Sequence, residues 1–590
     1  MGSGLLLLLC CCLPTALGAQ YLTVYKHAPG TVLDPRVIAS VRSSSSGPPL
    51  SNLRLAVEDA PATPQTRDPG HGRPPFTSSR LRLATGDVSS VRVVLQCIGV
   101  GCTFGKGAVL RGINFDGRVE YNGSSLAFNL PAPGHYIATH YYLQVVVHNA
   151  TGAPHFARGK LFYFWLDRQR STPSPVRPIG DVTALGIVAN STTPQTVEIQ
   201  RLLDNGTVPQ LYFPGPAVYL TGSLFLQRPM SILLGEGATL QHPPPPMPNH
   251  HSDSAMGPPT PRSKHVQHVQ HVQHAQHRRL GASHCSSPAF LTISADGVHI
   301  GGRGGTLDAN GFAGHNVCVV DAANVTLRYL LLRGSASWST HIFRSDHVAV
   351  EGIKIFSGAD GIDPDNSRDV SLRSVFVHSN DDAIAVKATV AGSNTERIVC
   401  ERALLSTKKS CVKVGTESLS NFNDVLFSDV EGFDLDRGLV LYPSDGGKFA
   451  NVMFRRIRLS SFYPYANESR DGAALDFETK HRAGLSQLTN ISVVDVVVSK
   501  VTGSSLFKGV AGAPIENVAI RNLTLVMGLP HNNKTTGSGS GRPFVFECHG
   551  FVDAVTVEDD LHLEWGMYRD AWAGLQNDPK CLRLLHASGH

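Results

Sequence analysis

The sequence predicts an all-β protein in which a small β-sandwich precedes a parallel β-helix. The chain holds 57 glycines and 37 prolines among 590 residues, a turn-rich composition that disfavours long helical bundles. From about residue 290 onwards, short apolar segments recur without a helical face between them, which indicates a solenoid of stacked β-coils. Asn or Asp usually leads each segment, and the recurring apolar positions are Val298, Val325, Val348, Val370, Ile398, Val425, Val452, Ile491 and Val518.

Length and charge limit the classes of protein to which the chain can belong. A chain of 590 residues exceeds one ordinary compact domain and favours several domains or an elongated repeat array. Apolar residues make up 42% of it, charged residues only 17%, and the net charge is +5. Because this positive charge is dilute and no stripe of basic and aromatic residues accompanies it, we expect no nucleic-acid partner. We also expect a monomer.

Residues 1–19 have the pattern of a signal peptide. Five leucines at 5–9 and a cysteine-rich apolar stretch lead to small residues at Ala16, Gly18 and Ala19. A buried N-terminal helix is the alternative interpretation. No later stretch is apolar for long enough to cross a bilayer, so we expect a secreted, extracellular protein with no membrane anchor.

The number of cysteines and the glycosylation motifs also indicate a secreted protein. Eight cysteines remain beyond the signal peptide, and we expect disulfides between neighbours along the chain among Cys97, Cys102, Cys285, Cys318, Cys400, Cys411, Cys548 and Cys581. Nine N-x-S/T motifs predict glycans at Asn122, Asn149, Asn190, Asn205, Asn324, Asn467, Asn490, Asn522 and Asn533.

The elements divide the chain in order. Alternating runs separated by Pro/Gly/Ser stretches predict the β-sandwich over residues 20–175. A helix with its N-cap at Thr193 and its end near Asn205 would cover the first coil of a β-helix over 180–560. Residues 561–590 form a C-terminal tail.

Residues 242–284 interrupt the β-helix. They contain four consecutive prolines and then histidines at every third position, a low-complexity pattern that predicts a disordered, solvated insertion at a coil turn. A metal site is the alternative, because imidazoles cluster there.

The densest group of carboxylates lies in two consecutive repeats. Asp360 and Asp382 are 22 residues apart, which equals the local spacing from Val348 to Val370, so they should stack on one face of adjacent coils together with Asp381. Carboxylates this close cannot all ionise cheaply, so at least one pKa must rise. Glycoside hydrolysis needs such an acid beside an ionised carboxylate. Turn-forming aspartates or a Ca²⁺ site are the alternatives.

Several stretches of the chain resemble glycoside hydrolase family 28, the polygalacturonase-like branch of the right-handed parallel β-helices with the pectin-lyase fold. The resemblance covers roughly residues 180–560, and the leading β-sandwich resembles the N-terminal domain of some members. The stretches are Thr196-Val-Glu-Ile-Gln-Arg-Leu-Leu, Tyr212-Phe-Pro-Gly-Pro, Tyr219-Leu-Thr-Gly-Ser-Leu, Gly235-Glu-Gly-Ala-Thr-Leu, Gly302-Arg-Gly-Gly-Thr-Leu-Asp, Asp360-Gly-Ile-Asp and Asp381-Asp-Ala-Ile-Ala-Val-Lys.

The resemblance implies an inverting glycosidase that acts on a pectin- or polygalacturonan-like polysaccharide without a metal or cofactor. It assigns Asp381 as general acid and Asp360 and Asp382 as the carboxylates that activate water. The chain departs from the family pattern at 409–411, where the family has a histidine, and at 440–442, where it has a basic pair.

Other residues are candidates for substrate binding. Arg437, Lys413 or Lys408 could replace the missing basic pair, and Lys387 ends the last matched stretch. Trp338 and His341 could form the floor of a sugar subsite, and packing or a turn is the alternative role for them.

Two further functions stay open. A polysaccharide lyase on the same fold would need Ca²⁺, with Asp363 and Asp365 as possible ligands. The lost family residues also allow a non-catalytic glycan-binding protein.

Overall fold

The computed structural model describes most of the chain from the first strand to the last. It describes residues 36–43, 54–58, 76–83, 90–98, 103–133, 136, 138–145, 147–148, 160–168, 180–244, 285, 287–302, 304–462, 472–503, 505–527, 546–550 and 555–564. The predicted signal peptide and nearly all of the His-rich insertion lie outside these ranges. So does the predicted tail of 561–590 except for residues 561–564, which belong to a strand of the β-helix. No helix within them is long and apolar enough to cross a membrane.

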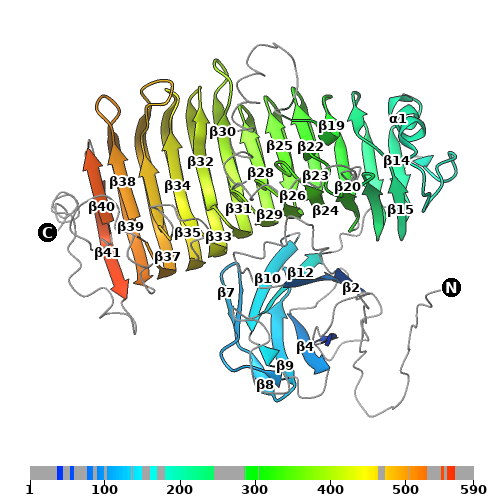
Figure 1. The fold of residues 1–590 in the computed structure, drawn as a ribbon, viewed down its shortest axis with the longest axis horizontal. Coiled ribbons are helices and arrows are strands. Elements are labelled where there is room, and N and C mark those ends of the chain that lie inside the picture. The colour runs from blue at the N-terminus through cyan, green and yellow to red at the C-terminus, as the bar shows by residue number, and fades with distance from the viewer. Residues whose placement is uncertain are drawn as a thin grey trace, which may run out of the picture.

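A right-handed parallel β-helix makes up the larger part of the described chain, as predicted (Figure 1). Its larger sheet contains 18 described strands that pair with their neighbours in parallel, coil upon coil. These strands are β13 (Gly180–Asp181), β14 (Gln210–Phe213), β15 (Ala217–Leu220), β17 (Ser231–Leu234), β18 (Ala238–Gln241), β20 (His299–Gly302), β21 (Thr306–Asp308), β23 (Ala323–Arg328), β24 (Leu331–Ser335), β26 (Asp346–Glu351), β27 (Lys354–Ser357), β29 (Arg368–Ser379), β31 (Thr395–Thr407), β33 (Phe422–Leu435), β35 (Lys448–Phe462), β37 (Gln487–Val501), β39 (Ile515–Met527) and β41 (Val555–Glu564).

A second parallel sheet closes each coil and carries the candidate site on its outer face. Its 11 described strands are β16 (Leu224–Leu226), β19 (Ala289–Ile293), β22 (His315–Val320), β25 (Thr340–Phe343), β28 (Ile362–Asp365), β30 (Ile384–Ala388), β32 (Ser410–Ser418), β34 (Arg437–Pro443), β36 (Leu475–Glu478), β38 (Ser505–Gly509) and β40 (Phe546–Gly550). The apolar core lies between the two sheets and runs continuously from the first coils to the last.

The predicted repeat is confirmed by the strand register. Val325 pairs with Val348, Val348 with Val370, and the series continues through the remaining predicted positions to Val518. The residue before each position from Val325 to Val518 has a positive φ between 52° and 57°, as at Asn451 and Asn517. Asn and Asp tolerate this left-handed conformation better than most residues. At six of the eight positions from Val325 to Val518 an Asn or Asp therefore makes the turn that begins the segment, and His347 and Arg397 take this place in the other two.

The N-terminal part of the described chain forms two main antiparallel-rich sheets. One has the order β1 (Arg36–Ser43), β4 (Ser90–Ile98), β9 (Ser125–Pro131) and β8 (Glu120–Asn122). The other has the order β2 (Arg54–Glu58), β3 (Phe76–Leu83), β12 (Lys160–Arg168), β10 (Ala138–Val145), β6 (Val109–Gly112) and β7 (Phe115–Gly117), and β11 (Val147–His148) pairs with β5 (Thr103–Phe104). Buried side chains of both main sheets, such as Phe128 and Phe164, form one core.

The helix α1 (Thr196–Asp204) begins later than predicted. Its N-cap is Gln195 rather than Thr193. The backbone N–H of Gln195 donates to Leu220 O, and its side chain bonds both backbone groups of Val188, so the preceding residues belong to the first coil. Ile199, Leu202 and Leu203 are buried against the β-helix core, as expected for a helix that covers its first coil.

The cysteines pair only in part as predicted. Cys285 and Cys318 form a disulfide. The expected pairing of Cys400 with Cys411 is wrong, because both are buried free thiols inside the β-helix. Burial raises the pKa of both thiols and so suppresses the thiolate that disulfide formation needs. The other two predicted pairs lie outside the described side chains.

The structure describes six of the nine predicted glycosylation sites. Asn149, Asn467 and Asn533 lie outside the described residues. The other six are all exposed, namely Asn122, Asn190, Asn205, Asn324, Asn490 and Asn522. Glycosylation therefore stays a prediction with accessible acceptors.

Candidate active site

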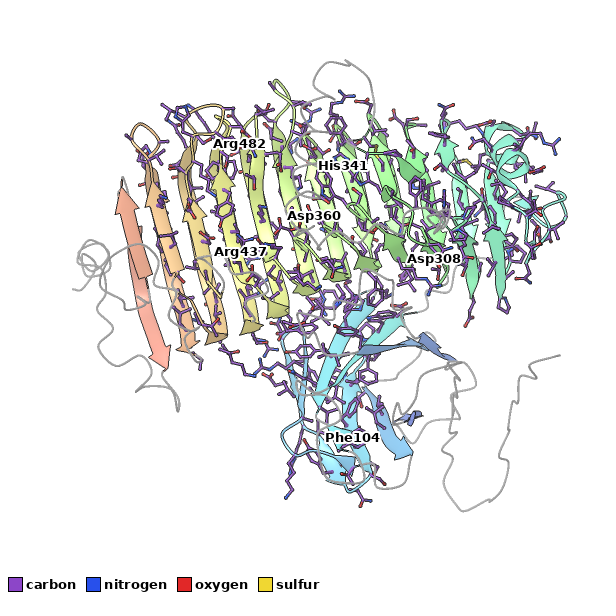
Figure 2. All side chains as sticks on the ribbon, in the orientation of Figure 1. Phe104, Asp308, His341, Asp360, Arg437 and Arg482 are labelled. Carbon is purple, nitrogen blue, oxygen red and sulfur yellow. A yellow bond between two sulfur atoms is a disulfide. The ribbon has the colours of Figure 1, made fainter. Side chains whose placement is uncertain are left out.

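Three aspartates from two adjacent coils meet at the outer face of the second sheet, where Figure 2 labels Asp360. Asp360 lies in the turn between β27 and β28, and Asp381 and Asp382 lie in the equivalent turn between β29 and β30. One carboxylate oxygen from each of the three lies within 4.8 Å of the others. The spacing that matches one coil therefore brings these carboxylates together, as the sequence predicted.

Short polar side chains at the strand ends fix the backbone of both turns. Ser357 Oγ donates to Asp360 O at 2.7 Å, and Ser379 Oγ donates to Asp381 O at 2.7 Å. Thr407 Oγ1 donates to the same oxygen of Asp381 from the next coil. The backbone N–H of Asp382 donates to Asp360 Oδ1 at 3.1 Å, which ties the two turns to each other.

Two lysines neutralise two of the three carboxylates. Lys387 Nζ donates to Asp360 Oδ2 at 2.9 Å, and Lys413 Nζ donates to Asp382 Oδ2 at 2.7 Å. Ser410 N, in the segment where the family has its histidine, donates to Asp382 Oδ1 at 2.9 Å. The cluster has the donor set of a cation site, and an ammonium group bonds one oxygen each of Asp360 and Asp382.

Asp381 and Asp382 are adjacent in sequence, but their surroundings shift their pKa values in opposite directions. Burial, together with the charges of Asp360 and Asp382, raises the pKa of Asp381 to about 7. Burial also acts to raise the pKa of Asp382, but Lys413, Arg437 and Lys387 outweigh it and hold that pKa well below its usual range. Near neutral pH the site therefore combines a carboxylic acid with a carboxylate.

Trp338 lies beside this cluster on the preceding coil. Its side chain is partly exposed, and Lys387 Nζ lies 4.1 Å from the centre of the indole ring. His315 stacks on the indole with a centroid distance of 5.5 Å. The accessible, supported ring can therefore offer an aromatic surface next to the carboxylates.

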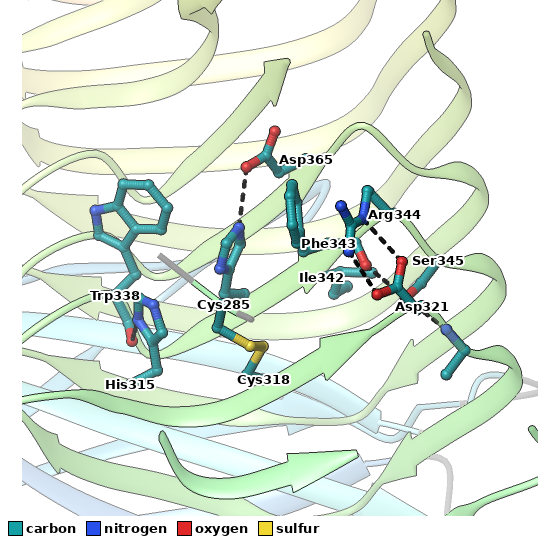
Figure 3. Close-up of a disulfide and its surroundings, with 12 residues drawn as sticks. Cys285, His315, Cys318, Asp321, Trp338, Ile342, Phe343, Arg344, Ser345 and Asp365 are labelled. Carbon is teal, nitrogen blue, oxygen red and sulfur yellow. Dashed lines mark hydrogen bonds and ion pairs between the residues drawn. A yellow bond between two sulfur atoms is a disulfide. The ribbon is translucent and has the colours of Figure 1, made fainter. Parts of the chain in front are cut away.

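His341 does not join Trp338 at the surface, which corrects the prediction. It is 1% exposed, and its Nε2 bonds Asp365 Oδ2 at 3.0 Å. The edge-to-face contact with Trp338 places it behind the indole. The Cys285–Cys318 disulfide lies in the same neighbourhood (Figure 3), so His341 is packed among the disulfide, Asp365 and the indole.

Asp363 and Asp365 do not have the arrangement expected for a calcium site. Both are fully buried, and Asp365 is occupied by His341 and by the N–H and hydroxyl of Thr389. Asp363 faces Lys387 at 3.5 Å, and burial beside Asp360 raises its pKa well above the usual value. These contacts hold Lys387, which is 4% exposed, inside the wall of the site.

Cations gather around Tyr442, one of the positions where the family's basic pair is missing. Lys480 Nζ lies 4.0 Å from its ring centre, and Lys413 Nζ and Arg437 Cζ each lie 5.9 Å from it. Arg437 Nη1 also donates to the tyrosine hydroxyl at 3.2 Å. The sequence predicts substrate-binding roles for Lys413 and Arg437 but not for Lys480 and Tyr442. Lys408 lies in the turn between β31 and β32.

The chain is similar to known proteins in its sequence and its fold. No family model matches the chain. It is similar to a curated "Probable polygalacturonase" from Vitis vinifera, with 23% identity over 277 residues, which cover 42% of this chain and 56% of the relative. The chain thus spans little more than half the length of that relative. The match agrees with the resemblance found in the motifs.

Solved structures give further matches. A hyperthermoactive exopolygalacturonase from Thermotoga maritima has a TM-score of 0.48 and 14% identity, covering 65% of this chain and 94% of that one. A family 28 exopolygalacturonase from Yersinia enterocolitica has a TM-score of 0.45 and 13% identity, covering 79% and 96%.

Proposed function

We propose that the protein is a secreted glycosidase that hydrolyses a pectin- or polygalacturonan-like polysaccharide. Asp381 protonates the glycosidic oxygen of the leaving group, while Asp360 and Asp382 orient and deprotonate the attacking water. The similarity to a polygalacturonase supports the class of reaction.

One observation carries the proposal: the pKa values of Asp381 and Asp382 are shifted in opposite directions within one cluster of carboxylates. A general acid must hold its proton near the working pH, and a base must be ionised there. Asp381 meets the first requirement, because burial raises its pKa to about 7. Asp382 meets the second, because Lys413 keeps it ionised.

We further propose inversion of the anomeric configuration, although carboxyl groups near 5 Å usually suit retention. A retaining enzyme needs a carboxylate oxygen free to attack the sugar. Both oxygens of Asp360 and both oxygens of Asp382 accept hydrogen bonds from Lys387, Lys413 or backbone N–H groups. Each of these oxygens keeps a lone pair that can accept a hydrogen bond from water, whereas attack on the sugar would require it to leave its present partners. Proton NMR of the first product anomer checks this assignment.

The substrate class rests on the cations around Tyr442. Lys480 lies closest to the ring, while Lys413 is paired with Asp382 and Arg437 with Asp436, so Lys480 is the cation from which we expect most of the attraction. A uronic acid carboxylate would be attracted to this charge, whereas a neutral sugar would not.

The test is reducing-sugar release from polygalacturonan, rhamnogalacturonan, dextran and pullulan by the wild type and by Asp381→Asn. We expect the wild type to cleave polygalacturonan or rhamnogalacturonan and Asp381→Asn to lose about 10²–10⁴ in rate. Asp369→Asn is the matched control, because Asp369 pairs with Arg397 away from the cluster.

Each alternative outcome has a clear meaning. Equal cleavage by wild type and Asp381→Asn excludes Asp381 as the acid. Sugar binding without turnover of any glycan supports a non-catalytic glycan-binding protein. An ultraviolet-absorbing unsaturated product that disappears with a chelator supports a lyase.

A further inference from the structure

The N-terminal sheets bind the β-helix through a buried interface. Strands β10 and β12 lie against the outer face of the larger sheet (Figure 1). Tyr163 and Trp165 of β12 are fully buried there, with ring centroids 4.8 Å and 5.3 Å from that of Phe376. The apolar residues that meet in this interface are Tyr142, Leu161, Tyr163, Trp165, Leu331, Phe356, Phe376, Leu404 and Phe433.

Buried polar contacts fix the orientation of this interface. Lys354, which is 0% exposed, donates to Asp167 of β12. His140 Nε2 of β10 bonds Ser374 O at 2.8 Å. Directional contacts between groups removed from water allow few alternative arrangements, because any shift leaves a buried polar group unpaired. The N-terminal sheets therefore bind the β-helix in one defined position.

The same strands of the β-helix carry the proposed catalytic turns. Phe356 contacts Trp165, and the next residue, Ser357, ends β27 and donates to Asp360 O. His378 bonds the hydroxyl of Tyr163 through Nδ1 at 3.2 Å. The residue after His378 is Ser379, which ends β29 and donates to Asp381 O at 2.7 Å.

We propose that Tyr163 of the N-terminal sheets is a positioning residue for Asp381 and acts through His378. This inference rests on the proposed function, since it assigns a role in the placement of the general acid. The path is short: one hydrogen bond joins Tyr163 to His378, one peptide bond joins His378 to Ser379, and one hydrogen bond joins Ser379 to the backbone of Asp381. The N-terminal sheets are thus part of the catalytic unit.

The short path from Tyr163 to Asp381 determines how far a change at Tyr163 should lower the catalytic rate. A general acid works only within hydrogen-bond reach of the oxygen that it protonates, and a displacement of about 1 Å can cost about 10²-fold in rate. Loss of the Tyr163 hydroxyl leaves the ring in place and removes the bond to His378. We therefore expect Tyr163→Phe to lower kcat about tenfold with little change in KM.

Tyr142→Phe is the matched control. Tyr142 lies in the same interface, is 2% exposed, and bonds Ser460 Oγ through its hydroxyl at 3.3 Å. Ser460 lies on β35, away from the turns that carry Asp360 and Asp381. Tyr142→Phe removes an equivalent buried hydrogen bond, so we expect a similar fall in melting temperature but an unchanged kcat.

Amide hydrogen exchange provides a readout that does not depend on activity. Mass spectrometry of the full-length protein should show faster exchange over residues 379–383 in Tyr163→Phe but not in Tyr142→Phe. If the wild type cleaves no polysaccharide, the proposed function fails while this comparison still decides the positioning role. Equal exchange and equal kcat in the two variants would overturn the proposal.

Variants of His378 test the second member of the path. His378→Ala removes the partner of Tyr163, whereas the amide of His378→Asn can occupy the place of Nδ1. We expect His378→Ala to reproduce the kcat loss of Tyr163→Phe and His378→Asn to restore part of it. The double variant Tyr163→Phe/His378→Ala should be no slower than His378→Ala alone, because both changes break one interaction. Additive losses would contradict a shared path.

Discussion

Nζ of Lys413 lies 2.7 Å from Oδ2 of Asp382, and both side chains are largely buried. Lys413 comes from β32, and Asp382 comes from the turn before β30, so the pair joins two adjacent coils. It keeps Asp382 ionised although burial alone would raise the pKa of that carboxyl. The charge of Asp382 in turn helps to hold the proton on Asp381.

Removal of this ammonium should disturb both aspartates. In Lys413→Met the pKa of Asp382 rises, because burial is no longer opposed by the nearest cation. The pKa of Asp381 is affected in two opposite ways, because the weakened charge of Asp382 lowers it and the loss of the Lys413 charge raises it. We expect kcat/KM to fall about 10²-fold, because Asp382 is then protonated in a larger fraction of the enzyme and cannot act as a base in that form. The acidic limb of the pH profile should move to higher pH.

Steady-state kinetics over a range of pH measures both effects. The control is Lys448→Met, because Lys448 is exposed. A Lys413→Met enzyme with an unchanged pH profile would show that another group sets the ionisation of Asp382.

The wild-type pH profile should lose activity on the alkaline side of neutrality. The pKa of Asp381 is raised to about 7, so the acid form predominates below that pH and is lost as the pH rises through it. A general acid is active only when protonated, so kcat/KM should decline by about tenfold for each pH unit well above 7. Reducing-sugar assays from acidic to mildly alkaline pH locate this limb, and an activity maximum well above neutrality contradicts the role of Asp381.

Trp338 should contribute to binding rather than to chemistry. Its ring is accessible, and Lys387 lies over one face of it. Trp338→Ala removes an aromatic surface, and a contact of about 0.5–1.5 kcal/mol corresponds to a KM increase of up to about tenfold with kcat unchanged. Trp338→Phe should recover most of the affinity. A fall in melting temperature with no change in KM would mean that Trp338 only packs against His315.

The fold follows from a local rule that repeats along the chain. A residue in the left-handed conformation, most often Asn or Asp, begins each segment, and an apolar residue directly after it enters the core, as at Asn451 and Val452. Both properties belong to single residues, so a sequence displays them without any knowledge of distant contacts. For the same reason, a separation equal to one coil was enough to bring Asp360 and Asp382 together.

The features that the sequence does not predict depend on contacts that do not recur at the spacing of the coils. Lys480 lies over the ring of Tyr442 and belongs to the longest interval between repeat positions, Val452 to Ile491, so no spacing indicates its position. The bond between Tyr163 and His378 spans 215 residues and joins separate parts of the fold. An even number of cysteines likewise predicts pairing but not that Cys400 and Cys411 remain buried thiols.

Lys480 offers a direct test of substrate charge. Its ammonium lies over Tyr442 on the outer face of the β-helix, beside Arg437 and Lys413, where a uronate carboxylate would experience several positive charges. We expect Lys480→Met to raise KM for polygalacturonan by up to about tenfold at low salt, which corresponds to the loss of one attraction of about 1 kcal/mol or slightly more. The difference from wild type should shrink at high salt, because ions screen charges at a partly exposed site. Methyl-esterified polygalacturonan lacks the carboxylate charge, so its KM should be the same for both proteins. An equal rise in KM for the charged and the esterified polymer would show that Lys480 supports the shape of the site instead of recognising a carboxylate.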